Sequence, residues 1–136
     1  MLEVMKGEYL LSYNLIHYDV ELVVMAGWMK IVSPFFINKF KNKIINIHPS
    51  LLPAYKGGSA IKDSILNGSK ITGCSVHFVE EEVDSGSLIM QAALSIRNDD
   101  DIESLTKRIQ MLEHKILPQS ISIAGFLIRS DFMENY

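Results

Sequence analysis

A short, nearly continuous apolar run that ends at a glycine constrains this chain most. The run covers residues 19–27 and ends at Gly27. Such a run is typical of a strand whose two faces are both covered in a parallel sheet. A second buried strand is predicted over residues 43–47. Two strands of this kind predict a sheet with helices packed on its faces, which is an α/β architecture.

Segments with helical character alternate with these strands. Apolar side chains have a loosely helical spacing over residues 8–17, which predicts a short helix. Ser33 is the predicted N-cap of a helix over residues 34–40, whose first position is a proline. Ser59 is the predicted N-cap of a further helix that ends at residues 67–68, an Asn-Gly pair.

The middle of the chain predicts an antiparallel hairpin. Side chains alternate over residues 72–79, with Ser75 and His77 on one side of a strand that we expect to be half-buried. A tight acidic loop over residues 80–86 then returns the chain into a second strand, over residues 88–96. The predicted fold is therefore a mixed, mostly parallel sheet flanked by helices.

The last predicted element is a long amphipathic helix. Asp100 and Glu103 have the spacing of a capping box. Apolar residues then repeat at intervals of three and four, namely Ile102, Leu105, Ile109, Leu112 and Ile116. Pro118 is expected to kink or break this helix.

Composition limits the classes of function. The 136 residues are 48% apolar and predict one domain over residues 1–136, and the net charge of −3 argues against a nucleic-acid partner. The longest apolar stretches are too short to cross a membrane, and the N-terminus has no signal-peptide pattern. Cys74 is the single cysteine, so we expect a cytoplasmic protein without a disulfide and without a metal site.

Two polar side chains lie at the end of the second predicted strand. Asn46 and His48 are two residues apart, so both project from the same face, and Pro49 holds His48 extended. Ligand crevices of open α/β sheets lie at such strand ends. The alternative is that His48 only satisfies backbone groups at the end of the strand.

Asp84, in the acidic loop, is a candidate partner for His48. It would reach the imidazole if the strand of residues 72–79 lay beside the strand of Asn46, and otherwise it belongs to an ordinary acidic turn. Gly57 and Gly58 lack the spacing of a phosphate-binding loop and predict a flexible turn.

Four motifs follow one another along the chain. They are Ala26-Gly-Trp-Met-Lys-Ile-Val-Ser-Pro34, Asn46-Ile-His-Pro-Ser-Leu-Leu-Pro53, Thr72-Gly-Cys-Ser-Val-His-Phe-Val79 with Asp84-Ser-Gly86, and Arg108-Ile-Gln-Met-Leu-Glu-His-Lys-Ile-Leu-Pro118. Together, in this order, they resemble the motifs of the glycinamide ribonucleotide transformylase family. The resemblance covers residues 19–124, and methionyl-tRNA formyltransferase and formyltetrahydrofolate hydrolase share its Asn-x-His and Asp pattern.

The resemblance implies a Rossmann-like formyltransferase fold that transfers a formyl group from 10-formyltetrahydrofolate to the amine of glycinamide ribonucleotide in purine biosynthesis. Asn46, His48 and Asp84 would be catalytic. The residues expected at the folate site are Met29, Lys30, Ile31, Val32, Glu80, Glu81, Glu82 and Val83. The residues expected to bind the nucleotide substrate are Pro49, Gln110 and Glu113.

Nothing before Asp19 resembles the glycine-rich strand, turn and helix with which the family binds the substrate phosphate. We therefore expect an N-terminally truncated domain, the C-terminal catalytic and folate-binding portion. Three interpretations remain open: a transformylase, a 10-formyltetrahydrofolate hydrolase, or a non-catalytic fragment. Without an earlier strand, the run of residues 22–26 is expected to leave an exposed sheet edge unless residues 1–17 fold over it. Such an edge predicts self-association of the chain, an incompletely ordered N-terminus or low stability.

Overall fold

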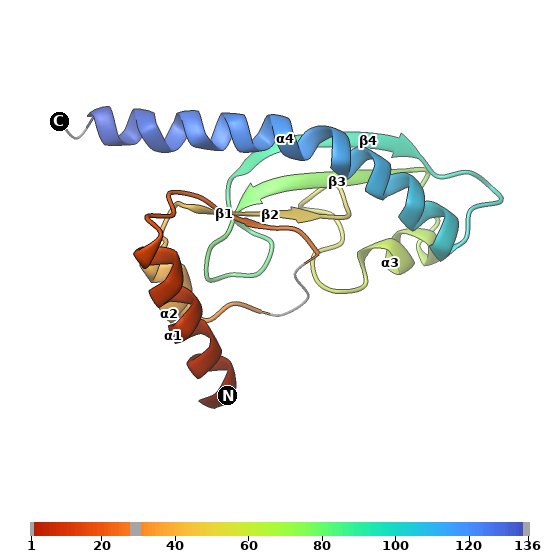
Figure 1. The fold of residues 1–136 in the computed structure, drawn as a ribbon. Helices are drawn as coiled ribbons and strands as arrows, with labels where there is room; N and C mark the ends of the chain where they lie inside the picture. The colour runs from red at the N-terminus through yellow and green to blue at the C-terminus, as the bar shows by residue number, and fades with distance from the viewer. Residues whose placement is uncertain (1, 28–30, 135–136) are drawn as a thin grey trace.

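The computed structural model describes residues 2–27 and 31–134, and the side chains of residues 7–27 and 31–130. The chain folds into one four-stranded sheet with helices on its two faces (Figure 1). Its elements are α1 (Leu2–His17), β1 (Val23–Met25), α2 (Pro34–Lys39), β2 (Ile44–His48), α3 (Ala60–Leu66), β3 (Ile71–Phe78), β4 (Leu88–Ser95) and α4 (Ile102–Glu134).

The strands follow the order β1-β2-β3-β4 across the sheet. β1 and β2 are parallel, whereas β2–β3 and β3–β4 are antiparallel. The predicted mixed sheet and the β3–β4 hairpin are therefore confirmed. The prediction of a mostly parallel sheet is wrong for the described residues, because two of the three strand pairs are antiparallel.

Successive side chains of a strand point to opposite faces of the sheet, and each face has its own hydrophobic core. On one face, residues of β2 and β3 pack against α4, in a cluster of Ile45, Ile47, Cys74, Val76, Leu105, Ile109, Ile116 and Ala124. On the other face, Ile44 packs against residues of α2 and its flanks, namely Val32, Phe36, Ile37 and Phe40. The α2 face is also the face that carries Asn46 and His48, because they lie two and four residues after Ile44 on the same strand.

β1 differs from its prediction in length and burial. It has three residues, it pairs with β2 alone among the described strands, and the side chain of Val24 is 37% exposed. A strand that has one neighbour cannot bury both of its faces as fully as a central strand, so the expected two-faced burial is wrong here. β2, with neighbours on both sides, buries Ile44, Ile45 and Ile47 as predicted.

The two N-terminal helices are joined by a polar contact. α1 begins at Leu2, ahead of the predicted start, and its buried Glu8 accepts hydrogen bonds from the backbone N–H of Ser33, at 2.9 Å, and from the Ser33 hydroxyl. Ser33 also accepts a bond from the N–H of Phe36, which confirms it as the N-cap of α2. Ser59 occupies the N-cap position of α3, but its side chain makes no capping bond.

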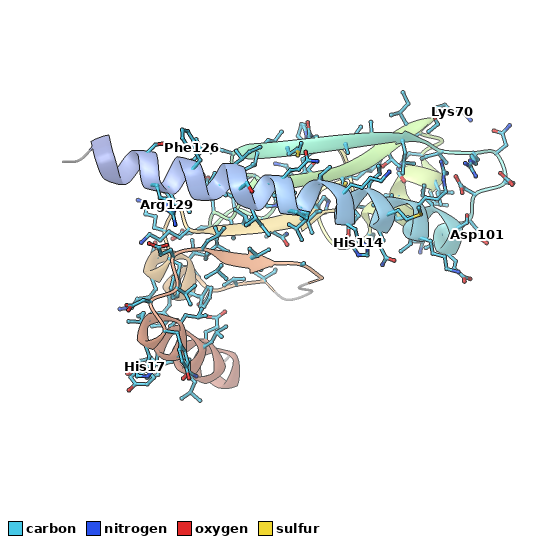
Figure 2. All side chains as sticks on the ribbon, turned by 45° about the horizontal axis from the view of Figure 1, so that its top comes forward. His17, Lys70, Asp101, His114, Phe126 and Arg129 are labelled. Atoms are coloured by element: carbon cyan, nitrogen blue, oxygen red, sulfur yellow. The ribbon has the colours of Figure 1, made fainter. Side chains whose placement is uncertain are left out.

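α4 crosses the sheet and continues past β1 (Figure 2). Near the C-terminal end of α4, the guanidinium Nη2 of Arg129 lies 3.9 Å from the carboxylate Oε2 of Glu21, which precedes β1. The predicted capping box is displaced by one residue: the Ser104 N–H donates to the Asp101 carboxylate at 2.8 Å, and the Asp101 N–H donates to the Ser104 hydroxyl at 3.0 Å. Among the described residues, no helix has both the length and the apolar character needed to cross a membrane.

Pro118 does not break α4, which runs through it as one helix. The proline is exposed, whereas Ile116 and Ser120 are buried on either side of it. Packing of the buried face therefore holds the helix together where one backbone N–H is missing.

Replacing Pro118 with alanine is expected to raise the free energy of unfolding by about 1–3 kcal/mol, because a backbone N–H is restored in a helix interior. Urea unfolding measures the change. Alanine at the exposed neighbour Gln119 is the control and is expected to change stability by less than about 0.5 kcal/mol. An unchanged or lower midpoint for P118A would contradict the expectation.

Candidate active site

The pairing of β2 with β3 gathers four polar side chains on the α2 face of the sheet. In the antiparallel register, Asn46 lies opposite His77 and His48 lies opposite Ser75. His48, Ser75 and His77 are buried, and Asn46 is half-buried. The strand of residues 72–79 thus lies directly beside that of Asn46, which is the arrangement on which a partnership of Asp84 with His48 depends.

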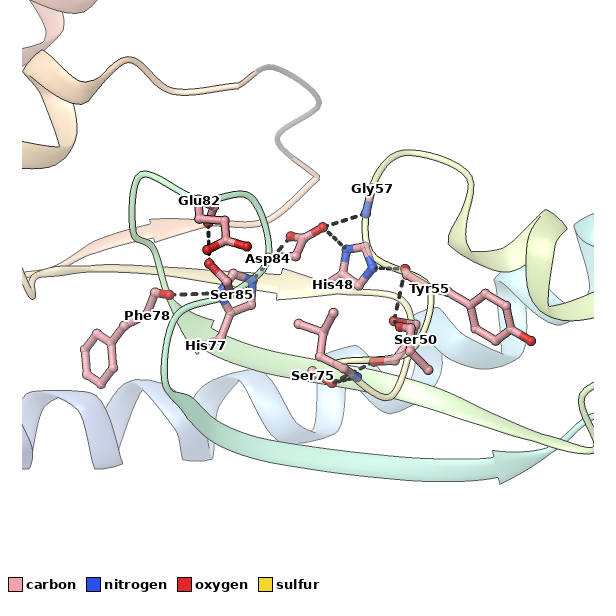
Figure 3. Close-up of polar contacts among 12 residues, drawn as sticks. His48, Ser50, Tyr55, Gly57, Ser75, His77, Phe78, Glu82, Asp84 and Ser85 are labelled. Carbon is pink, nitrogen blue, oxygen red and sulfur yellow. Dashed lines mark hydrogen bonds and ion pairs between the residues drawn. The ribbon is translucent and has the colours of Figure 1, made fainter.

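Asp84 lies between the two histidines (Figure 3). Its Oδ2 is 3.4 Å from His48 Nδ1, and its Oδ1 is 3.6 Å from His77 Nε2. Oδ2 also accepts a hydrogen bond of 2.8 Å from the backbone N–H of Gly57. The predicted proximity of Asp84 to His48 is confirmed, and the carboxylate contacts a second histidine that the sequence did not assign to the site.

The loop after β2 is fastened to the sheet by Ser75. The Ser75 hydroxyl donates to the carbonyl of Ser50 at 2.6 Å and accepts from the N–H of Leu52 at 3.0 Å and from Gln91 Nε2 at 2.9 Å. Gln91 also donates to the Leu52 carbonyl at 3.0 Å. Because this loop covers Ser75, β3 is buried on both faces, and the expectation of a half-buried strand is wrong.

The same loop holds His48 from the side opposite Asp84. The carbonyl of Tyr55 lies 2.8 Å from His48 Nε2, and the Tyr55 hydroxyl lies 2.5 Å from the hydroxyl of Ser69. Gly57, at φ +93°, adopts a backbone conformation that favours glycine, and it donates to Asp84. The predicted turn therefore contributes a backbone N–H to the site.

Sequence reasoning missed Ser75, His77 and Gly57 as parts of this site. Ser75 and His77 are two residues apart and therefore share one face of their strand, and this spacing was the available signal in the sequence. It did not identify which strand lies beside them. The Gly57 contribution is a backbone N–H, which no side-chain pattern reports.

The residues expected at the folate site have different surroundings. Met29 and Lys30 lie outside the described residues. Ile31 is 76% exposed, whereas the side chain of Val32 is buried in the α2 core. The side chains of residues 80–83 are exposed and form the segment that leads to Asp84.

The residues expected to bind the nucleotide lie on two elements. Pro49 is half-buried directly after His48, Gln110 is exposed on α4, and Glu113 is half-buried on α4. Burial raises the pKa of the Glu113 carboxyl. The Glu113 charge also adds to the burial that raises the pKa of the Cys74 thiol to about 11. Among the described residues, no polar contact joins Gln110 or Glu113 to Asp84, so their place at the site stays a prediction.

The residues that the structure describes contain no group of three or more His, Cys, Asp or Glu side chains arranged to hold a metal ion.

Burial dominates the protonation of His77. Removal from water lowers the pKa of the imidazole, against the opposing effects of the Phe78 carbonyl and Asp84, while the nearby His48 lowers it further. The charged form of His77 is thus disfavoured in the folded protein relative to the unfolded chain.

Stability is therefore expected to depend on pH through His77. The unfolded chain binds a proton near the ordinary value of 6.5, while folded His77 stays neutral, so stability is lost as pH falls from 6.5 through the lowered pKa. Urea unfolding over about pH 5–8 measures this slope. His77→Gln is expected to reduce the slope, and His17→Gln, at an exposed histidine outside the site, is the control.

Comparison with known proteins identifies the class to which this fold and site belong. The model of the formyl transferase family matches residues 6–121, so the chain belongs to the formyl transferase family. Within it, the chain is 44% identical over 112 residues to phosphoribosylglycinamide formyltransferase of Haemophilus influenzae, covering 82% of this chain and 50% of that protein.

Two further matches agree. The trifunctional purine biosynthetic protein adenosine-3 of Chironomus tentans is 44% identical over 126 residues, which cover 91% of this chain and 9% of that protein. The crystal structure of phosphoribosylglycinamide formyltransferase from Anaplasma phagocytophilum superposes with a TM-score of 0.82 at 44% identity, covering 85% of this chain and 57% of that one. The chain thus spans less than two thirds of the length of each of these proteins.

Proposed function

We propose that this chain carries the catalytic and folate-binding portion of an enzyme that transfers the formyl group of 10-formyltetrahydrofolate to the amine of glycinamide ribonucleotide, a step of purine biosynthesis. One observation carries the proposal. Asp84 lies 3.4 Å from His48 at the end of β2, beside Asn46, within a formyl transferase fold. The similarity to phosphoribosylglycinamide formyltransferases supports the choice of acceptor.

The chemistry begins with attack of the amine on the formyl carbon. A C–N bond forms, and the carbonyl oxygen becomes an oxyanion that needs hydrogen-bond donors or positive charge. Asn46 supplies an amide donor, and no side-chain hydrogen bond within the described residues occupies that amide. His48 Nε2 faces the Tyr55 carbonyl and His48 Nδ1 faces Asp84, so neither nitrogen is free to bond the oxyanion. In its protonated form, His48 therefore acts on the oxyanion through its positive charge.

Asp84 accepts and then releases a proton during the reaction. The attacking amine becomes cationic and gives a proton to the Asp84 carboxylate, directly or through one water. Asp84 then returns this proton to the folate nitrogen, directly or through one water, as the bond between that nitrogen and the formyl carbon breaks. The products are the formylated amine and tetrahydrofolate, so the atoms and charges balance.

The test compares this chain with and without the nucleotide substrate. Incubation with 10-formyltetrahydrofolate and glycinamide ribonucleotide is expected to yield formylated nucleotide, detected by mass spectrometry. Formate release without the nucleotide would support the hydrolase alternative, in which water replaces the amine. No turnover in either reaction would leave the chain a non-catalytic fragment and refute the proposal.

The proposed partners are these small molecules, and the proposed location is the cytoplasm. Cys74 is a free, buried thiol, which fits a reducing compartment.

Self-association through the edge of β1 is also expected. Among the described strands β1 pairs only with β2, and the side chain of Val24 on this strand is 37% exposed. Sedimentation velocity at rising concentration is expected to show a dimer, and Val24→Lys, which places a charge on the open edge, is expected to restore the monomer. A monomer at every concentration would contradict this expectation.

A further inference from the structure

His77 is a buried side chain at the site that the proposed mechanism does not use. It is 2% exposed, and its Nε2 has no hydrogen-bond partner. This nitrogen is 3.6 Å from Asp84 Oδ1, just beyond hydrogen-bond distance. An unpaired buried nitrogen directed at a carboxylate is costly unless a proton can occupy the space between them.

The backbone fixes which nitrogen of each ring carries hydrogen. His77 Nδ1 lies 2.9 Å from the carbonyl of Phe78, and His48 Nε2 lies 2.8 Å from the carbonyl of Tyr55. A carbonyl only accepts, so both of these nitrogens are donors. In the neutral rings, His48 Nδ1 and His77 Nε2 therefore carry lone pairs, and these are the two nitrogens that face Asp84.

The two oxygens of Asp84 offer two separate places for a proton. With both rings neutral and Asp84 ionised, a lone pair of each ring faces a carboxylate oxygen, and all four atoms are acceptors. One proton between His48 and Oδ2 relieves one contact. A second proton, between Oδ1 and His77 Nε2, relieves the other. The cluster thus has two separate places for a proton, one on each oxygen of Asp84.

We propose that His77 is a positioning residue that acts through Asp84, because its Nε2 accepts the hydrogen bond of the proton that Asp84 takes up on Oδ1. Within the proposed function, the amine gives this proton to the carboxylate, and the new O–H donates to His77 Nε2. The proton then leaves Oδ1 for the folate nitrogen as the bond between that nitrogen and the formyl carbon breaks. His48 takes no part in this transfer, because its Nδ1 faces the other oxygen of the carboxylate, Oδ2.

The surroundings of His77 favour its role as a neutral acceptor. Among the described residues, the titratable groups that face it are Asp84, from the loop after β3, and His48, from β2. Burial lowers the pKa of His77, so the ring is poised to accept a hydrogen bond rather than to hold a charge.

The first test needs no catalysis. In ¹⁵N-labelled protein, long-range ¹H–¹⁵N spectra report which ring nitrogen carries hydrogen, and exposed His17 serves as the internal reference. We expect neutral His77 to be protonated on Nδ1 and neutral His48 on Nε2. Asp84→Asn is expected to lower the pKa of His77, because the negative charge is lost, whereas His48→Gln is expected to raise it. Hydrogen on Nε2 of neutral His77, or a titration that neither substitution changes, would overturn the inference.

The second test uses His77→Gln, which can form hydrogen bonds but cannot titrate. We expect kcat to fall about tenfold with little change in KM, because His77 acts on a proton transfer and not on substrate binding. The acid limb of the kcat profile is expected to move to lower pH, since an amide N–H directed at Oδ1 favours the carboxylate form. His17→Gln is the matched control.

The outcomes separate the two proposals. If the unmodified chain transfers no formyl group, the proposed function fails, and the NMR spectra alone decide the role of His77. If transfer occurs and His77→Gln leaves both kcat and the pH profile unchanged, the role of His77 is refuted while the proposed function stands. Loss of kcat with the shifted acid limb and the expected NMR spectra would support both.

Discussion

Asp84→Asn is expected to lower kcat for formyl transfer by about 10³-fold, with an equal loss in kcat/KM. An amide cannot accept the proton of the attacking amine, and the substitution removes the negative charge that lies 3.4 Å from His48 Nδ1. Asparagine tolerates the backbone of this position, at φ +53°, so the loop is expected to keep its shape.

The matched control is Asp99→Asn, an exposed carboxylate outside the site. It is expected to transfer the formyl group at the unmodified rate. Initial rates over a range of both substrates, together with an unfolding curve for each variant, complete the comparison. Near-normal turnover by a folded D84N protein would remove Asp84 from the mechanism.

Gly86→Ala is expected to lower kcat by about 10²-fold and the free energy of unfolding by about 1–3 kcal/mol. A Cβ at this position would lie 1.7 Å from the carbonyl oxygen of Phe78, so the backbone of the hairpin has to move. That carbonyl also accepts the hydrogen bond of His77 Nδ1, and Asp84 lies two residues before Gly86. The displacement therefore disturbs the histidine and the carboxylate together.

Alanine substitutions at two other glycines distinguish an effect on the rate of formyl transfer from an effect on the free energy of unfolding. Gly58 has open space around its Cβ position, so Gly58→Ala is expected to change neither. Gly73→Ala would place its Cβ 1.9 Å from the carbonyl of Ala92, between β3 and β4, and is expected to reduce stability with a smaller loss of rate than Gly86→Ala. Normal rate and stability for G86A would mean that Phe78 and Gly86 do not approach this closely in solution.

Local patterns in the sequence determined much of the scaffold. The apolar content of residues 43–47 and the period of two along residues 72–79 predict strands that the structure contains. Ser33 caps α2 through a contact three residues away, which a local motif can encode. The shared face of Asn46 and His48 follows from strand geometry alone, so this half of the site was readable without tertiary structure.

The tertiary structure alone decided the features that depend on distant neighbours. Packing of α4 against the sheet outweighs the local cost of Pro118, and the position of β1 at the edge of the described sheet leaves Val24 exposed. Pairing of β2 with β3 brings His77 beside His48, and the two loops bring Asp84 and the N–H of Gly57 to them. These contacts join residues far apart in the chain, and their geometry depends on sheet order and loop closure rather than on the period or composition of any one segment.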